Sequence, residues 1–258
     1  MVAWQRLSGG WQLPTALQYW RRHLKAGIPE YLARHYWWAY LSHGAVRVFD
    51  HPAIISAILF GNYRILMRAV LKRLKPHNCG RFLQFTSVYG ELIPSLHDEL
   101  DITGFHLTDI APVQLDSALK KTNAPGGKQG VMASQANVEC LPYADNSFDT
   151  LLIFFLLHEL PEKARKNALL EAMRILRPGG RLIVVEYAEL TQSNWLHRNP
   201  VSRSILEFVE PYLENFWRGS LRDQLEQAAM GSGKKISQQD EEKFFHGFYR
   251  LLDMQIDV

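Results

Sequence analysis

The stretch Gly180-Arg181-Leu182-Ile183-Val184-Val185-Glu186-Tyr187 decides the fold. Its unbroken apolar centre, Leu182–Val185, predicts a strand that is buried on both faces of a parallel sheet. Arg177-Pro178-Gly179 comes directly before it and ends a helix, because proline cannot continue a helix and glycine tolerates the positive φ of a turn. That helix is indicated by apolar residues at helical spacing, which are Leu169, Ala172, Met173 and Leu176. A helix that leads into a buried strand is the repeating unit of an α/β fold.

Four further strands are predicted before this one. They are Arg81–Thr86, Gly104–Asp109, Gly130–Ser134 and Asp149–Phe155. Helical segments lie between them, and one begins near Pro161, where the missing N–H of proline would be unpaired in any case. The alternation implies right-handed crossovers, a parallel sheet, and a ligand crevice at the carboxyl ends of the strands.

The pattern is different before the first strand. Lys75-Pro76-His77-Asn78-Cys79-Gly80 ends a helical N-terminal third of the chain. We therefore expect a helical extension over residues 1–78 and an α/β domain over residues 79–258. We expect the two to form one structural unit.

The composition is that of a globular protein. Of the 258 residues, 47% are hydrophobic and 21% are charged, and the net charge of +3 is too small to indicate a nucleic-acid partner. Two cysteines, Cys79 and Cys140, cannot build a disulfide framework or a cysteine-rich zinc site. No apolar run approaches the ~20 residues of a spanning helix, so we expect no transmembrane helix.

The N-terminus is rich in cations and poor in acids. Before Glu30 it holds only basic charges, namely Arg6, Arg21, Arg22 and Lys25. This composition is typical of an organelle transit peptide. It also suits a basic, aromatic helix that touches a membrane surface or the body of the protein, and we favour this second interpretation.

A turn and the strand after it carry the first family resemblance. Leu141-Pro142-Tyr143-Ala144-Asp145-Asn146-Ser147-Phe148-Asp149, followed by Arg177-Pro178-Gly179-Gly180-Arg181-Leu182, resembles the class I methyltransferases. The resemblance implies a Rossmann-like, mostly parallel seven-stranded sheet with added N-terminal helices, and S-adenosylmethionine as the cofactor. In that family a residue at the place of Asn137 meets the adenine amino group. The alternative is that Asn137 only caps a turn, as asparagine often does.

Asp109 ends the predicted second strand, 23 residues after Thr86 ends the first. A carboxylate in this place can accept hydrogen bonds from a ribose diol. Nicotinamide-binding folds share such an acid, so Asp109 alone does not identify the nucleoside. Asp109 can also cap the helix that begins near Pro112.

The loop after the first strand departs from the methyltransferase pattern. Gln84-Phe85-Thr86-Ser87-Val88-Tyr89-Gly90-Glu91-Leu92 holds one glycine where the family has a glycine-rich turn. Val88 is β-branched and Tyr89 is bulky, so neither readily adopts a positive φ. We expect a different backbone path, with Tyr89 in the space that glycines would leave. A domain that binds no cofactor is the alternative.

Several motifs together resemble the rhodoquinone-biosynthesis enzymes, which are relatives of methyltransferases. The motifs are Ile28–Leu32, His35–Leu41, Val88–Leu92, Phe154–Glu159 and Phe244–Tyr249. The resemblance runs from about Ile28 to the C-terminus. It implies that S-adenosylmethionine donates an amino group that replaces a ring methoxy group of ubiquinone, with a divalent metal, Mn²⁺, taking part. Methyl transfer to a quinone or another hydrophobic small molecule is the alternative, and a non-enzymatic partner protein is a third.

The resemblance also implies a set of site residues. The cofactor-binding residues are Val88, Tyr89, Gly90, Asp109, Ile110, Gln135, Ala136, Asn137 and Phe154. The substrate-binding residues are Tyr36, Trp37, His158 and Tyr187. Tyr89 and His158 are the expected catalytic residues, and ubiquinone is the expected substrate.

His158 follows the predicted fourth strand, where a side chain can face the crevice. It can act as a general base, as a metal ligand, or as a donor to a quinone oxygen. Since the chain has no HxxxH pair, His158 is the one metal ligand that we name. Glu159 is a weaker candidate, and Glu186 can line the acceptor pocket or support it as a structural acid.

Two aromatic or apolar stretches bear on the substrate and on the membrane. The crowded aromatics between Tyr31 and Tyr40 suit a ring-binding pocket or a membrane interface. Apolar residues at helical spacing follow later, namely Ile205, Phe208, Val209, Tyr212, Leu213, Phe216 and Trp217. We favour a lid over the active site for this stripe, and place contact with a bilayer second. The expected location is peripheral, on the cytoplasmic or mitochondrial-matrix face of a membrane.

Overall fold

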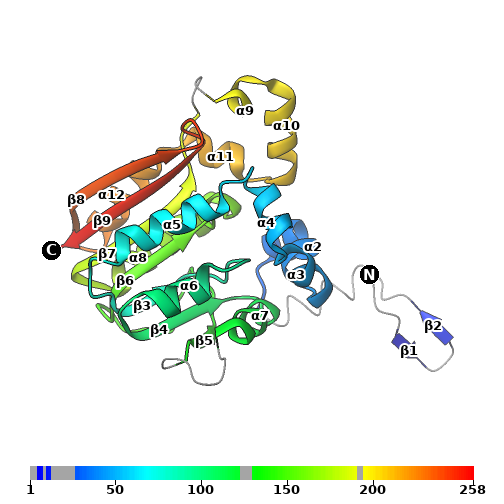
Figure 1. The fold of residues 1–258 in the computed structure, drawn as a ribbon, viewed down its shortest axis with the longest axis horizontal. Helices are drawn as coiled ribbons and strands as arrows, with labels where there is room; N and C mark the ends of the chain where they lie inside the picture. The colour runs from blue at the N-terminus through cyan, green and yellow to red at the C-terminus, as the bar shows by residue number, and fades with distance from the viewer. Residues whose placement is uncertain (1–4, 8–9, 13–26, 123–129, 191–193) are drawn as a thin grey trace.

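A computed structural model describes residues 5–7, 10–12, 27–122, 130–190 and 194–258 of the chain. Its centre is a seven-stranded sheet with the order β5-β4-β3-β6-β7-β9-β8 (Figure 1). The strands are β3 (Gly80–Gln84), β4 (Ile102–Asp109), β5 (Met132–Gln135), β6 (Phe148–Phe154), β7 (Leu176–Tyr187), β8 (Lys235–Phe244) and β9 (Tyr249–Asp257). All neighbours are parallel except β9, which runs antiparallel to both β7 and β8. The predicted mostly parallel seven-stranded sheet is confirmed.

Helices cover both faces of this sheet, with α5 and α6 on one side and α8 and α12 on the other (Figure 1). The helices before the sheet are η1 (Leu32–Tyr36), α2 (Trp37–Tyr40), α3 (His43–Phe49), α4 (Pro52–Ile58) and α5 (Tyr63–Leu74). Those between its strands are α6 (Leu92–Glu99), α7 (Pro112–Thr122), η2 (Leu157–Glu159), α8 (Glu162–Ile175), α9 (Trp195–Arg198), α10 (Pro200–Val209), α11 (Leu213–Arg218) and α12 (Leu221–Gly231).

The core lies along β6 and β7. Leu151, Ile153, Val184 and Val185 have no exposed surface, as expected for strands buried on both faces. The face of α5 that carries Leu66, Val70 and Leu74 packs into the same core. The division of the chain at residue 78 stays a prediction, and this shared core supports the expectation of one structural unit.

Most predicted elements agree with the structure to within a few residues. The predicted strand at Gly180 begins earlier, at Leu176, because Leu176 pairs with Phe148 before the register shifts. Gly179 still makes the predicted turn with a φ of +75°. The helix near Pro161 begins at Glu162, with Pro161 in the cap position.

The expected N-terminal helix is wrong where the structure describes that segment. β1 (Gln5–Leu7) and β2 (Gly10–Gln12) form a two-stranded antiparallel sheet instead. Arg6 is part of β1. The other basic residues, Arg21, Arg22 and Lys25, lie outside the described residues.

The apolar stripe of residues 205–217 is split between two helices. α10 ends at Val209, and Pro211 cannot continue it. After the break, Leu213, Phe216 and Trp217 of α11 are buried in the core, as expected of a lid. The first part of the stripe is not packed in this way, since α10 contains no buried residue.

The helices of the described segments were compared with the length and hydropathy of a membrane span. None of them alone is long and apolar enough to cross a bilayer. α4 and α5 satisfy the length and composition criterion only together, and they are bent by 90° relative to each other.

Candidate functional site

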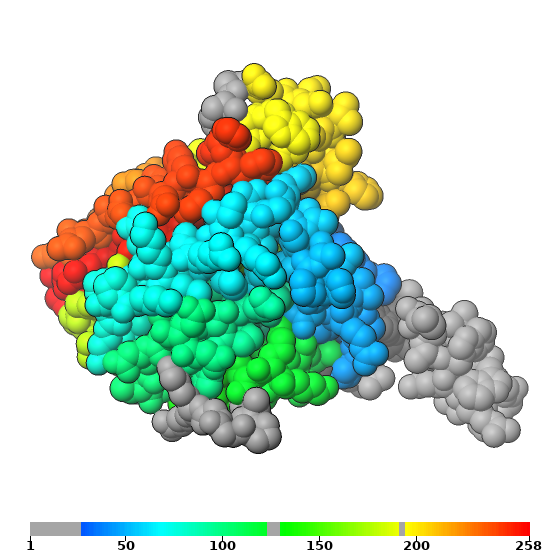
Figure 2. Space-filling model, in the orientation of Figure 1, coloured from blue at the N-terminus to red at the C-terminus, as the bar shows by residue number. Residues whose placement is uncertain are grey.

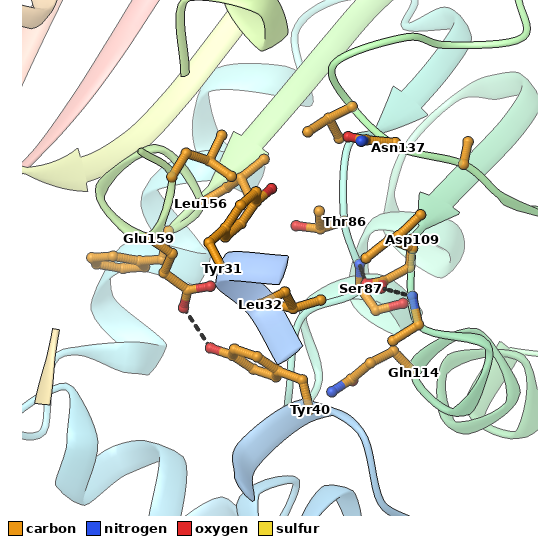
Figure 3. Close-up of a pocket in the computed structure, with 16 residues that line it drawn as sticks. Tyr31, Leu32, Tyr40, Thr86, Ser87, Asp109, Gln114, Asn137, Leu156 and Glu159 are labelled. Carbon is orange, nitrogen blue, oxygen red and sulfur yellow. Dashed lines mark hydrogen bonds between the residues drawn. The ribbon is translucent and has the colours of Figure 1, made fainter. Parts of the chain in front are cut away.

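A pocket lies at the carboxyl ends of β3, β4 and β6, where a doubly wound sheet places its ligands (Figure 3). We call it the Asp109 pocket. Its floor comes from the sheet side and includes Thr86, Ser87, Asp109, Ile110, Ala136 and Asn137. Tyr31, Leu32 and Tyr40 of the N-terminal segment form the facing wall. The cavity is small, at about 80 Å³, which is below the ~300–1,000 Å³ usual for small-molecule sites.

Asp109 is held by backbone donors on both of its carboxylate oxygens. Oδ2 accepts from the Ser87 N–H at 2.9 Å, and Oδ1 accepts from the Ala111 N–H at 2.8 Å. Burial raises the pKa of Asp109 to about 7, although these N–H groups work in the opposite direction. The bond to Ala111 closes a turn directly before α7, so Asp109 shapes the entry to this helix without capping its first N–H groups. This bond does not exclude a ligand, because Asp109 also faces the pocket.

Asn137 likewise combines a structural contact with a place in the pocket wall. Its Oδ1 accepts from the Glu139 N–H at 2.9 Å and so caps the turn. Ile110 and Ala136 lie beside it in the pocket. Gln135 does not line the pocket, because its exposed side chain turns back and Nε2 donates to the Ile110 carbonyl at 3.1 Å.

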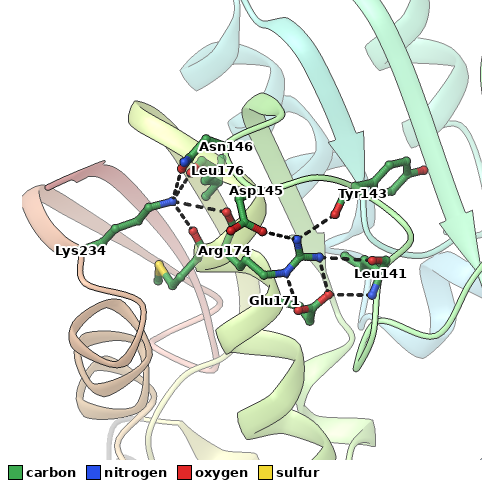
Figure 4. Close-up of polar contacts among 9 residues, drawn as sticks. Leu141, Tyr143, Asp145, Asn146, Glu171, Arg174, Leu176 and Lys234 are labelled. Carbon is green, nitrogen blue, oxygen red and sulfur yellow. Dashed lines mark hydrogen bonds and ion pairs between the residues drawn. The ribbon is translucent and has the colours of Figure 1, made fainter.

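The turn after Asn137 is held by a network around Arg174 of α8 (Figure 4). Arg174 Nη1 donates to the Tyr143 carbonyl at 2.8 Å and to the Asp145 carboxylate at 2.7 Å. Its Nη2 donates to the Leu141 carbonyl at 3.2 Å and to Glu171, which in turn accepts from the Leu141 N–H. One arginine therefore fixes the backbone that follows a predicted cofactor residue.

A second pocket opens beside the first, and we call it the His158 pocket. Its lining is largely aromatic and aliphatic and includes Trp38, Phe49, Ile58, Val88, Tyr89, Phe154, His158, Tyr187, Val209 and Glu210. Tyr40, Ser87, Phe155 and Glu159 line both pockets, so the two spaces adjoin. Phe155 has a φ of +51°, which is a strained conformation of the kind that collects at functional sites.

The loop after β3 follows the path expected from its sequence. Within this described loop, Gly90 has a positive φ, at +81°, and Val88 and Tyr89 do not. The Gly90 N–H donates to Asp50 Oδ1 at 2.7 Å. Lys121 Nζ donates to the same Asp50 oxygen at 2.7 Å and to the Gly90 carbonyl at 2.9 Å. Asp50 of the N-terminal helices therefore clamps the loop.

Tyr89 fills the space beside the loop and lines the His158 pocket, not the Asp109 pocket. Its hydroxyl donates to the Ala39 carbonyl at 2.7 Å and accepts from Gln114 Nε2 at 2.7 Å. Its ring stacks on Tyr40 and Phe49, with centroids 5.9 and 6.1 Å away. Burial raises the pKa of Tyr89 well above its ordinary value, so its hydroxyl stays neutral.

His158 stands among three carboxylates in the His158 pocket, and its neighbour Glu159 lines both pockets. Its Nδ1 lies 2.9 Å from Glu186 Oε2, and Glu186 is fully buried. The main-chain N–H groups of Leu157 and Tyr187 donate to the same carboxylate. His158 Nε2 lies 3.9 Å from Glu210 Oε2. Of the two roles considered for Glu186, the structure therefore favours the structural one, in which its carboxylate supports His158 and does not line the pocket.

The two acids beside His158, Glu159 and Glu210, each accept a hydrogen bond from a tyrosine, and the pKa values in this cluster are shifted. Tyr40 donates to Glu159 at 2.5 Å, and Tyr36 donates to Glu210 at 3.0 Å. Burial, followed by the charge of Glu210, raises the pKa of Glu159 to about 8. Burial disfavours the imidazolium form of His158, but the carboxylates of Glu186, Glu210 and Glu159 outweigh it and raise its pKa to about 9.

The cluster fits a divalent cation by its donor atoms. His158, Glu159 and Glu210 each offer one ligand atom, and the three atoms lie within 4.8 Å of one another. An imidazole nitrogen with carboxylate oxygens is a donor set that suits Mn²⁺. The Glu186 contact occupies Nδ1 and orients the ring, as partners of metal-binding histidines usually do.

The other predicted site residues are divided between the interior and the surface. Phe154 and Tyr187 line the His158 pocket. Tyr36 is buried and reaches the cluster through Glu210. Trp37 is 39% exposed and lines neither of the two pockets, while Trp38 and Tyr40 do line the His158 pocket.

Comparisons with known proteins agree with this geometry. Residues 87–184 match a family model described as "Methyltransferase domain". The ubiquinone/menaquinone biosynthesis C-methyltransferase UbiE of Francisella philomiragia is 31% identical over 131 residues, which are 50% of this chain and 52% of that protein. The chain thus spans about half the length of the curated relatives that it matches.

Solved structures with the same fold include enzymes of different reactions. Phosphoethanolamine N-methyltransferase 2 of Haemonchus contortus, in complex with S-adenosyl-L-methionine, is 14% identical with a TM-score of 0.61, covering 90% of this chain and 60% of that one. The [4+2]-cyclase SpnF is 17% identical with a TM-score of 0.56, covering 85% and 97%. The fold of this chain is therefore the class I S-adenosylmethionine-dependent methyltransferase fold, and fold alone does not fix a reaction.

Proposed function

We propose, from the class I methyltransferase fold of this chain, that it is an S-adenosylmethionine-dependent transferase that methylates a quinone or a similar hydrophobic ring. The observation that carries the proposal is the pair of adjoining pockets. One has a buried carboxylate at the end of β4, and the other is apolar and aromatic and contains His158. The relatives named for quinone C-methylation support the substrate class.

The Asp109 pocket is the proposed cofactor site. Asp109 accepts hydrogen bonds from the ribose hydroxyls, and Ile110, Ala136 and Asn137 surround the adenine. Val88, Tyr89 and Phe154 line the adjoining His158 pocket, and we assign them, together with Gly90 of the same loop, to the methionyl end of the cofactor. Gln135 supports this site through Ile110, since its side chain does not face the cavity.

Replacing Asp109 with alanine should weaken S-adenosylmethionine binding by at least tenfold, because each charge-assisted hydrogen bond to the ribose contributes about 1.5–3 kcal/mol. Titration calorimetry on the folded variant measures this loss. Asp116→Ala, an exposed acid on the nearby α7, is the matched control. Wild-type affinity in a folded Asp109→Ala protein would contradict the ribose assignment.

The His158 pocket is the proposed acceptor site. Tyr187 and Phe154 contact the ring, and Tyr36 acts through Glu210. Carbon methylation requires removal of a ring proton, and His158 is the proposed base. The alternative role of His158 is that of a metal ligand, because Glu186 occupies Nδ1 and Nε2 cannot serve both as base and as ligand. In that case a divalent cation, Mn²⁺ above all, would be held by His158, Glu159 and Glu210, and would polarise an oxygen of the acceptor ring.

Amino transfer to ubiquinone, which gives rhodoquinone, is the second candidate. The specific observation in its favour is the clamped loop with Val88 and Tyr89, which differs from the glycine-rich turn of methyltransferases. In this reaction the methionyl nitrogen joins the ring carbon and the methoxy group leaves as methanol. The bond between that nitrogen and the cofactor Cα must then break. Loss of the Cα proton with transfer of two electrons into the quinone ring gives an imine of the reduced ring, and water hydrolyses this imine to the aminoquinol and an α-keto acid derived from the cofactor.

Incubation of two acceptors with S-adenosylmethionine and Mn²⁺, followed by mass spectrometry, separates the two reactions. Ubiquinone, whose ring carbons are all substituted, reports amino transfer, and a reduced quinone that keeps one ring C–H reports methyl transfer. Methyl transfer raises the mass of the acceptor, and exchange of methoxy for amine lowers it. A product of lower mass identifies amino transfer. No conversion of any tested quinone by a protein that binds the cofactor would contradict both candidates.

Changing Val88 and Tyr89 together to glycine should abolish amino transfer and preserve cofactor binding, if the present loop orients the methionyl amine. Misplacement of the reacting atoms by 1 Å can cost about 10²-fold in rate. Val88→Ala with Tyr89→Phe is the control that keeps most of the packing. If the double glycine variant keeps the wild-type rate of amino transfer per folded molecule and only its melting temperature falls, Val88 and Tyr89 fill space and do not direct the amine.

A further inference from the structure

Large apolar side chains are exposed together at one end of the molecule. They project from α3, α4 and α10, and we call the surface formed by Val48, Ile54, Ile58, Val201, Ile205 and Phe208 the apolar end. Figure 2 shows the segment of α2–α4, in blue, beside the segment of α9–α10, in yellow. Contiguous apolar surfaces of this kind on a protein usually mark an interaction site.

α10 has the pattern of a helix that lies on an interface. Val201, Ile205 and Phe208 follow one another at helical spacing on one face, and Phe208 is 87% exposed. Ser202, Arg203 and Glu207 occupy other positions of the helix. Because α10 has no buried residue, its apolar face is not used for packing within the described chain.

α4 adds a second apolar contact beside the first. Its sequence Pro-Ala-Ile-Ile-Ser-Ala-Ile contains no charged residue, and Ile54 and Ile58 are exposed. Ile58 also lines the His158 pocket, as do the exposed Trp38 of α2 and Val209 of α10. The apolar end is therefore continuous with the mouth of the proposed acceptor site.

The charges around the apolar end favour an anionic partner. Residues 43–65 and 194–209 carry four arginines, namely Arg47, Arg64, Arg198 and Arg203, and two acids. Both acids are already paired, Asp50 with Lys121 and Glu207 with Arg203. Anionic lipid headgroups attract such a basic rim.

We infer that the apolar end docks on an anionic lipid bilayer, with α4 and α10 inserted at the headgroup level and the His158 pocket opening toward the acyl chains. This inference rests on the proposed function in one respect, since a hydrophobic acceptor can then enter the pocket directly from the bilayer. A second copy of the chain on the same surface would instead close the mouth of the pocket. The bilayer is therefore the occupant that keeps the proposed enzyme open.

The test is flotation of the full chain with phosphatidylcholine vesicles, with and without cardiolipin. Wild-type protein should float, and more of it should float with cardiolipin. Ile205→Glu with Phe208→Glu should reduce the floating fraction at least tenfold. Met230→Glu, a similar change at a 67% exposed residue of α12, is the control and should float like wild type.

Calorimetry and two substrates complete the experiment. The double variant should keep wild-type affinity for S-adenosylmethionine and wild-type turnover of a short-tailed quinone in solution, and should lose turnover of a long-tailed quinone in vesicles. Wild-type protein that stays at the bottom of the gradient, or a double variant that floats, would overturn the inference. So would a wild-type dimer that the double variant dissociates. Flotation without quinone turnover would instead overturn the proposed function and leave the docking surface standing.

Discussion

Replacing His158 with glutamine should lower the turnover number by about 10²–10⁴-fold, which is the usual contribution of a positioned acid or base. Cofactor affinity should not change, because His158 does not line the Asp109 pocket. Steady-state kinetics and calorimetry measure the two effects separately. His77→Gln, on the surface at the opposite end of β3, is the control.

The pH dependence of the reaction tests the same assignment of His158 as the general base. Because its neighbouring carboxylates raise the pKa of His158 to about 9 against the effect of burial, the base form becomes populated only as the pH rises toward 9. Burial and Glu210 raise the pKa of Glu159 to about 8, so this group also changes its charge over the same range. The wild-type value of kcat/KM should therefore rise between about pH 7 and 9. In the His158→Gln variant, kcat/KM should stop rising in the part of this range near pH 9. A wild-type kcat/KM that falls as the pH rises from 7 to 9 would contradict the assignment of His158 as the general base.

Replacing Arg174 with methionine should lower the free energy of unfolding by about 3 kcal/mol. Methionine keeps the apolar stem but removes every hydrogen bond of Arg174 to Leu141, Tyr143, Asp145 and Glu171. Such bonds contribute roughly 1.5–3 kcal/mol each when buried, and much less here because the Arg174 side chain is 29% exposed and Asp145 is 70% exposed. The melting temperature should fall by roughly 5–10 °C. Cofactor affinity should fall as well, because the network fixes the turn after Asn137.

Arg218→Met is the matched control for this change. Arg218 also pairs with a glutamate on its own helix, Glu214, but the side chains are 74% and 46% exposed. Exposed pairs of this kind contribute about 0.3–0.5 kcal/mol. Equal melting temperatures of the two variants would show that the Arg174 network is no stronger than a surface pair.

The sheet could be predicted because its information is local. The apolar centres of β6 and β7 are long enough to require burial on both faces, and the Pro178-Gly179 turn marks where β7 is entered. The places of Asp109 and Asn137 at the edge of the sheet could be predicted for the same reason, since each follows a recognisable strand. Such signals do not depend on distant parts of the chain.

Residues whose role depends on distant contacts were missed. Asp50 precedes Gly90 by 40 residues, and nothing in either segment indicates their hydrogen bond. Glu210 lies within the apolar stripe of residues 205–217, and the only signal for it was an acid among apolar neighbours. Gln114 lies on α7 and contacts Tyr89 only because α7 packs near the loop.

The misplacement of Trp37 has a geometric cause. η1 is a π-helix, in which one turn holds more residues than in an α-helix. The extra residue rotates the side chains that follow relative to those of an ordinary α-helix. Tyr36 and Ala39 are buried as a result, and Trp37 faces outward.

The clamp between Asp50, Lys121 and Gly90 has a consequence for how this protein can change over generations. The shape of the loop depends on an acid that lies outside the segment matched by the methyltransferase model, residues 87–184. A mutation of Asp50 leaves the Gly90 N–H and the Lys121 ammonium without their shared acceptor, so it selects against the loop as well. In homologous proteins, a loop with one glycine and a tyrosine at the position of Tyr89 should therefore be inherited together with an acid at the position of Asp50. Lineages that regain the glycine-rich turn should be free to lose that acid.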